Sequence, residues 1–251
     1  MTFLYLYLFS IGVVLGSFFN VVGMRIPIGK SIIKPRSACP NCGHVLQIGE
    51  LIPIISFMLQ SGKCKKCGEK ISILYPIIEF LTGCLFVLSF YRFGVNFEFI
   101  IAITIISLLM IVIASDLSYM LIPNRILLFF FPIIIVERFI NPLIPLKSSL
   151  VGAICAFLFL FFVAVISKGG MGGGDVKLMG LLGYVLGLKL IILTFVIACF
   201  SGTIIGLAII RSGKTKQQRN PIPFGPFIAL GGLISYFYGN EIISWYLLIR
   251  G

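Results

Sequence analysis

The feature that most constrains this chain is a series of apolar runs about twenty residues long, the length that crosses the hydrocarbon core of a bilayer. Seven are clear, and an eighth, at 176–188, is shorter and interrupted by glycine. They lie at about 3–22, 71–91, 97–115, 125–140, 148–167, 176–188, 190–210 and 222–239. Only 11% of the 251 residues are charged, against about 25% in soluble domains. The sequence therefore predicts an all-α, polytopic membrane protein of about eight transmembrane helices.

The distribution of Lys and Arg predicts the orientation of these spans. If the N-terminus lies outside, fifteen Lys and Arg residues fall in cytoplasmic loops and five fall outside. By the positive-inside rule, the loops 23–70 and 211–219 are then cytoplasmic. This topology explains the net charge of +12. The 211–219 cluster is either a solvated loop or a contact with membrane lipids. We expect no nucleic-acid binding, because no basic patch is interleaved with aromatic residues.

Four of the seven cysteines form two CxxC pairs, CPNC at 39–42 and CKKC at 64–67. This spacing is close to that of zinc ribbons, in which each pair presents two sulfurs from one tight turn. Two disulfides are the alternative, which a reducing cytoplasm disfavours. We therefore predict a structural zinc held by Cys39, Cys42, Cys64 and Cys67, inserted after the first helix. The single histidine, His44, is expected to be solvated rather than to replace one of these ligands.

Aspartate occurs only twice, at Asp116 and Asp175, each at the cytoplasmic end of a predicted span. An ionisable residue at this depth is costly unless it is paired or functional. Either residue alone could be structural, Asp175 as a helix cap and Asp116 as a helix end. If the fold brings them together, one carboxyl stays protonated while the other is anionic, because two neighbouring carboxyls do not both ionise easily. Such a pair can activate a water and protonate a leaving amide.

Five glycines between positions 169 and 174 precede Asp175. They allow backbone or a substrate strand to approach the carboxyl closely, since any side chain there obstructs the approach. The segment is neither a Walker loop nor a dinucleotide fingerprint, because the Gly-Lys-Ser/Thr ending and the GxGxxG spacing are absent. The chain also lacks GxSxG and HExxH, which removes the common serine and zinc hydrolase motifs.

A series of ordered motifs along nearly the whole chain resembles the type IV prepilin peptidases, bifunctional leader peptidase/N-methyltransferases of the GxGD aspartyl class. The motifs are GSFFNVVGMRIP (16–27), PRSACPNCG (35–43), LIPIISF (51–57), GKCKKCGEKIS (62–72), YPIIEFLTG (75–83), LIPN (121–124), GGGDVKLMGLLG (172–183) and PFGPF (223–227). Two positions depart from the usual pattern: Asn124 stands where many relatives carry Asp, and Glu50 occupies a variable position. Neither departure touches the two aspartates.

The resemblance implies an aspartic endopeptidase of the prokaryotic cytoplasmic membrane that removes the short basic leader of a prepilin or pseudopilin at the cytoplasmic face. Asp116 and Asp175 are then the catalytic pair, Gly172 and Gly174 are the glycines of GxGD, and Lys177 supports the loop or the substrate. The resemblance also implies methylation of the new N-terminus with S-adenosylmethionine. The residues that bind this methyl donor are not identified, although the intramembrane Glu79 is a candidate alongside a role in helix packing.

The resemblance also implies a division of labour along the chain. Residues 1–92 form the methyltransferase-associated region with the cysteine loop, residues 97–210 form the GxGD peptidase core, and residues 211–251 form a basic loop and a C-terminal helix. Two other classes of function stay open. A transporter would use the two aspartates as a midplane ion site, but both lie at the cytoplasmic edge and no internal repeat is visible. The other is a zinc-knuckle scaffold without catalysis.

Overall fold

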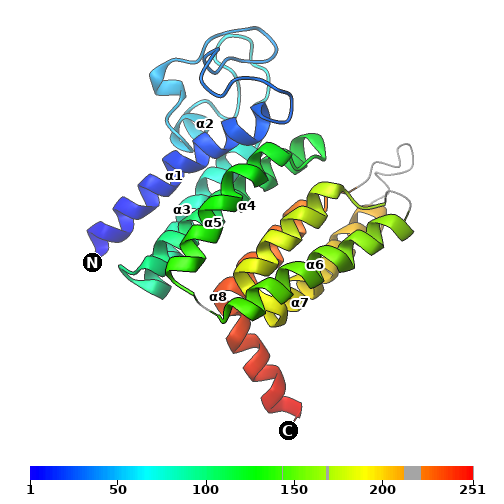
Figure 1. The fold of residues 1–251 in the computed structure, drawn as a ribbon. Helices are drawn as coiled ribbons and strands as arrows, with labels where there is room; N and C mark the ends of the chain where they lie inside the picture. Colours follow the sequence, from blue (N-terminus) through cyan, green and yellow to red (C-terminus); the bar gives the residue numbers. More distant parts are fainter. Residues whose placement is uncertain (143, 168–169, 212–221, 251) are drawn as a thin grey trace. The chain divides into compact units, whose positions relative to one another are not determined.

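The computed structural model describes residues 1–142, 144–167, 170–211 and 222–250 (Figure 1). The expectations for Gly169 and for most of the basic 211–219 loop lie outside these residues. The regular secondary structure of the described residues is helical apart from two isolated β-bridges, and the chain divides into two compact units, Met1–Ser115 and Asp116–Gly251. The boundary falls inside α4, directly before Asp116, whereas the sequence-based division assigned this helix to the peptidase core. The functional division stays a prediction.

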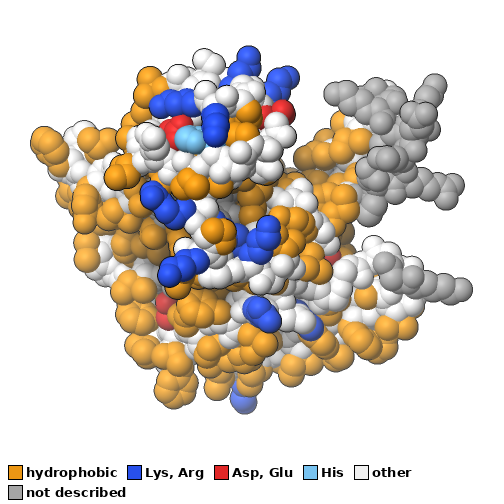
Figure 2. All heavy atoms as spheres, turned by 90° about the horizontal axis from the view of Figure 1, so that it is seen from above, with side chains coloured by type: hydrophobic (Ala, Val, Ile, Leu, Met, Phe, Trp, Pro, Cys, Tyr) orange, Lys and Arg blue, Asp and Glu red, His pale blue; other side chains and the backbone are white. Residues whose placement is uncertain are grey.

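In the first unit, α1 (Thr2–Arg25) packs against α3 (Leu74–Phe93), and α4 (Phe97–Tyr119) follows. Glycines allow close contact between helices, as small residues commonly do in membranes. A Cβ at Gly12 would lie 2.7 Å from the Cα of Gly83. The connection between α1 and α3 is the cysteine-bearing loop, with the 3-10 turn η1 (Ile48–Glu50) and the short helix α2 (Ile55–Leu59). Figure 2 shows Lys and Arg side chains over this loop and hydrophobic side chains over the helices.

The second unit contains α5 (Asn124–Ile140), α6 (Leu146–Ile166), α7 (Gly173–Arg211) and α8 (Gly225–Arg250). The label α7 covers two helices, because Gly187 breaks the helical backbone with φ 72° and ψ 174°. Contacts with α6 show that the chain reverses at this break. A Cβ on Gly180 would lie 3.3 Å from Phe157, while the Phe159 and Phe195 rings are 5.2 Å apart. Positions 180 and 195 therefore lie at similar heights along α6.

Within the part of the chain that the structure describes, five helices have the length and the apolar composition of membrane spans: α1, α3, α4, α6 and α7. This supports the prediction of an all-α integral membrane protein. The count of eight is not confirmed by these criteria. Helix α5, with 17 residues, is shorter than the five helices counted as spans. Helix α7 is counted as one span, although its two halves run in opposite directions.

Candidate active site and metal centre

Both aspartates lie at helix ends within the second unit. Asp116 is near the end of α4, Asp175 is the third residue of α7, and their side chains are 5% and 8% exposed. The two carboxyl groups are close enough to interact electrostatically. The structure thus brings together the two acidic residues that the sequence singled out, from positions 59 residues apart. It also buries them, which strengthens any charge–charge interaction between them.

A backbone donor holds Asp116 from a third helix. The N–H of Gly225, the first residue of α8, donates a 2.8 Å hydrogen bond to Oδ2 of Asp116. The contact leaves no room for a side chain, because a Cβ on Gly225 would lie 2.8 Å from the same oxygen. Sequence reasoning missed this role. Its signal was the PFGPF motif at 223–227, which contributed to the resemblance without being assigned a contact.

The glycines before Asp175 have separate local roles. A Cβ on Gly172 would lie 3.0 Å from Oδ2 of Asp175, and one on Gly174 would lie 2.7 Å from the Cβ of Ile122. Gly172 therefore leaves space for the carboxyl group, while Gly174 allows the segment after α4 to pack against the start of α7. Gly173 differs from both, because a Cβ there would meet nothing within 4 Å.

Two further polar groups lie near the start of α7. Oδ1 of Asp175 is buried and has no hydrogen-bond partner among the described residues. A buried oxygen of this kind is costly unless water or a ligand satisfies it. Lys177, two residues further along, donates a 2.8 Å hydrogen bond from Nζ to Oδ1 of Asn124. This contact ties α7 to the first residue of α5. The loop- or substrate-supporting role of Lys177 stays a prediction.

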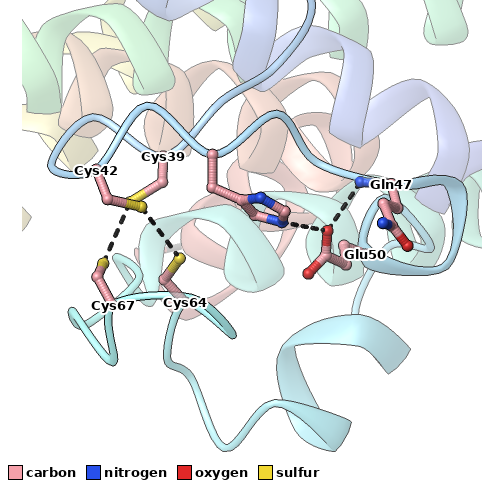
Figure 3. Close-up of polar contacts among 7 residues, drawn as sticks. Cys39, Cys42, Gln47, Glu50, Cys64 and Cys67 are labelled. Carbon is pink, nitrogen blue, oxygen red and sulfur yellow. Dashed lines mark hydrogen bonds and ion pairs between the residues drawn. The ribbon is translucent and has the colours of Figure 1, made fainter.

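The four predicted cysteines form one cluster in the first unit. Their sulfur atoms all lie within 4.8 Å of one another, with 3.8 Å between Cys39 and Cys67 and 3.9 Å between Cys42 and Cys64. Four sulfurs placed 2.3 Å from a tetrahedral zinc lie about 3.8 Å apart. The cluster therefore fits this metal. Figure 3 shows the two pairs facing each other from separate turns.

The two cysteine turns have matching backbones. The N–H of Cys39 donates to the carbonyl of His44, and the N–H of Cys64 donates to the carbonyl of Glu69. Gly43 and Gly68 have φ of 68° and 72°. A Cβ at either glycine would meet nothing within 4 Å. The positive φ, rather than crowding, is therefore what favours glycine at both positions.

The backbone of the turns also prepares the thiols for a cation. The N–H groups of Cys42 and Asn41 lower the pKa of Cys39 to about 7. The Glu69 N–H lowers the pKa of Cys67, but desolvation and the neighbouring sulfurs outweigh it and raise this pKa to about 11. The four thiols therefore do not all ionise together at neutral pH unless a cation compensates the charge, and a bound metal ion supplies that compensation.

His44 is not a member of the sulfur cluster. Its Nε2 lies 3.1 Å from Oε2 of Glu50, and the same oxygen accepts a 2.8 Å hydrogen bond from the N–H of Gln47 (Figure 3). The histidine is thus held by a carboxylate, where the sequence suggested a solvated side chain. This contact connects the first cysteine turn to η1, a role for Glu50 that the sequence did not indicate.

Models of two protein families match most of the chain. The model of the bacterial peptidase A24 N-terminal domain matches residues 10–93, and that of the type IV leader peptidase family matches residues 103–207. A Bacillus subtilis (strain 168) protein named prepilin leader peptidase/N-methyltransferase is 47% identical over 240 residues, or 96% of each chain. The chain belongs to the type IV leader peptidase family. This confirms the resemblance found in the sequence.

Other members of the family with the same name are more distant. The protein of Xanthomonas campestris pv. campestris is 32% identical over 96% of this chain and 94% of its own length. That of Aeromonas salmonicida (strain A449) is 30% identical over 96% of this chain and 92% of its own length. No solved structure matches the chain.

In this member of the family, Glu79 has a structural contact. The side chain is 6% exposed, and its Oε2 accepts a 2.8 Å hydrogen bond from the N–H of Ile54. Ile54 has φ of 61°, a strained value for a β-branched residue. Glu79 therefore stabilises the turn that begins α2. A role for Glu79 in binding the methyl donor stays a prediction.

Proposed function

We propose that this chain is a membrane aspartic endopeptidase that removes the leader of a type IV prepilin or pseudopilin, with Asp116 and Asp175 as the catalytic pair. The observation that carries the proposal is the buried pair of interacting carboxyls, of which Asp116 also accepts a hydrogen bond from the Gly225 N–H of a third helix. A helix cap needs neither a second acid nor a donor from a distant helix. The names of the relatives support the choice of a prepilin as substrate.

In the proposed reaction, the pair acts as one carboxylate and one carboxylic acid. The carboxylate accepts a proton from a water molecule as the water oxygen attacks the scissile carbonyl carbon. The acid donates a hydrogen bond to the developing oxyanion, and a proton is then delivered to the leaving nitrogen as the C–N bond breaks. The Gly225 N–H orients Asp116, while Oδ1 of Asp175 is available for water or substrate.

A cleavage assay tests this proposal directly. The full chain, reconstituted in lipid vesicles, is given a prepilin substrate, and leader release is measured by mass spectrometry. The proposal requires a single cut before the hydrophobic helix of the substrate. An intact substrate after incubation with folded, metal-loaded protein would favour a scaffold. Ion uptake into the vesicles without cleavage would favour a transporter.

The proposal includes methylation of the new N-terminus. The relatives are named as both peptidases and N-methyltransferases, and residues 10–93 match the bacterial N-terminal domain model. We assign the activity to the cysteine-bearing region 1–92 and S-adenosylmethionine as the methyl donor. A cleavage-dead variant should still methylate an already mature pilin. Absence both of S-adenosylmethionine binding by calorimetry and of methylated product would reduce the function to peptidase alone.

We further propose a topology of eight spans with the N-terminus outside and both aspartates at the cytoplasmic face. The distribution of Lys and Arg supports this orientation, and the reversal at Gly187 supports counting α7 as two spans. Single cysteines introduced near Ser31 and near Asn96 into a protein otherwise free of accessible thiols test it. Labelling from outside is expected near Asn96 alone, and the opposite pattern contradicts the orientation.

A further inference from the structure

A large apolar groove lies in the second unit, between α5, α6 and the first half of α7. Its volume is about 670 Å³. Its lining includes Leu128, Phe131 and Ile154, whose side chains are 69%, 52% and 55% exposed. The groove therefore opens toward the surroundings of the helices, which for a membrane protein are lipid.

The groove faces away from the aspartate pair. On α7 it is lined by Lys177, Gly180, Leu181 and Tyr184, whose i, i+3, i+4, i+7 spacing places them on one face of the helix. Asp175 is two residues before Lys177, about 200° away around a helix of 3.6 residues per turn. A chain lying in the groove would be on the opposite side of α7 from the Asp175 carboxyl. This geometry disfavours the peptide substrate as occupant.

The length of the groove matches one leaflet of a bilayer. On α5 the lining residues extend from Asn124 to Ile135, or about 16 Å at 1.5 Å per residue. Half of a typical hydrocarbon core is about 15 Å. One acyl chain aligned with α5 would therefore reach from the polar end of the groove to about the middle of the membrane.

The charge lies at one end of the groove. Lys177 and Asn124 line it at the first turns of α7 and α5. Among the described residues, Nζ of Lys177 donates a hydrogen bond to the neutral amide oxygen of Asn124, at 2.8 Å. The ammonium charge is thus not compensated by this contact, and the side chain is exposed. An ammonium group above an apolar groove of one-leaflet length matches a phosphate followed by an acyl chain.

We propose that this groove binds one anionic phospholipid of the surrounding membrane, with its phosphate at Lys177 and an acyl chain along α5, α6 and α7. The site is separate from the catalytic pair, so the inference does not rest on the proposed peptidase activity. Lysine near a membrane surface favours anionic lipid by about 1 kcal/mol, which corresponds to about a five-fold preference.

The test compares two lipids with identical acyl chains, phosphatidylglycerol and phosphatidylcholine. The full-length, metal-loaded protein is stripped of lipid in detergent, and lipid binding is followed by native mass spectrometry. We expect one retained phosphatidylglycerol and about a five-fold preference over phosphatidylcholine. Lys177→Gln should abolish that preference. Lys189→Gln is the matched control, because Lys189 is an exposed lysine of the same unit that does not line the groove, and it should leave the preference unchanged.

A second variant tests the apolar part of the site. Ala153→Trp fills the groove from α6 without altering its charge, so it should release both lipids. Equal retention of the two lipids by the wild type, or equal effects of Lys177→Gln and Lys189→Gln, would overturn the proposal. Two competitors distinguish the source of the binding. Inorganic phosphate should not displace the lipid. Displacement by a peptide carrying the apolar helix of a prepilin would assign the groove to the substrate and overturn the proposal.

Discussion

The cysteine cluster and the aspartate pair are assembled over very different distances along the chain. All four sulfurs come from residues 39–67, from two turns with the same backbone pattern. The aspartate site combines residues 116, 175 and 225, each from a different helix. The cysteine site is therefore a local structure, with four sulfurs that could hold a metal ion. The aspartate site depends on the packing of helices, and glycines determine how closely their backbones approach.

The largest effect is expected from substituting the aspartates, which should lower cleavage without lowering the metal content. Asp116→Asn or Asp175→Asn keeps the size of the side chain but removes the carboxyl, so we expect cleavage to fall by roughly 10³-fold or more. The double variant should be little worse than either single one, because the pair acts as a unit. Metal content should stay that of the wild type. A folded, metal-loaded Asp175→Asn protein that cleaves at nearly the wild-type rate would make Asp175 a helix cap, since Asn caps about as well as Asp.

Replacing the closely packed glycines should have the next largest effect on cleavage. Gly225→Ala places a methyl group 2.8 Å from Oδ2 of Asp116, so either the carboxyl or the start of α8 must move. A displacement of about 1 Å in a catalytic group can lower the rate about 10²-fold. Gly174→Ala should lower the cleavage rate by a similar factor, because the added methyl group would lie 2.7 Å from the Cβ of Ile122.

Gly173→Ala is the matched control for these substitutions, because a methyl group there meets nothing within 4 Å. It should leave cleavage within about two-fold of the wild type. Initial rates at saturating substrate provide the measurement. Equal losses from Gly173→Ala and Gly174→Ala would mean that flexibility of the glycine segment, rather than close packing, is what the site requires.

The same contrast explains what the sequence could predict. The CxxC spacing and the rarity of aspartate identified all six residues, because both signals are visible without knowledge of the fold. The contact of Gly225 with Asp116 was not predicted, although the PFGPF motif marked this segment, since a backbone N–H leaves no chemical signature and its partner lies 109 residues away. The His44–Glu50 contact was missed for a related reason, and for Glu79 the sequence suggested helix packing but not the contact with the Ile54 N–H. Each depends on how a loop folds back, which apolar periodicity does not reveal.

The metal site should respond to substitution mainly through stability. Cys39→Ser or Cys64→Ser removes one of four ligands, and we expect the zinc content to fall from about one per chain to a small fraction of that. The loop should then become more accessible to protease. Cleavage should fall much less than in Asp175→Asn. Cys84→Ser is the control, because Cys84 lies in α3 outside the cluster. Wild-type protein without zinc after reduced purification would contradict the assignment.

The smallest effect concerns the Glu50 contact. The N–H of Gln47, followed by His44, lowers the pKa of Glu50 below its usual value. The stability that this carboxylate contributes is therefore fully present above the unfolded pKa of about 4.3 and is lost as the pH falls through the lower folded value. Glu50→Gln removes the charge, and we expect faster amide exchange in residues 44–51 of the zinc-loaded protein. After correction for intrinsic exchange rates, the difference from wild type should still be present at pH 5.5, since Glu50 stays ionised there. A difference that disappears by pH 5.5 would mean that Glu50 is not the titrating group that stabilises the turn.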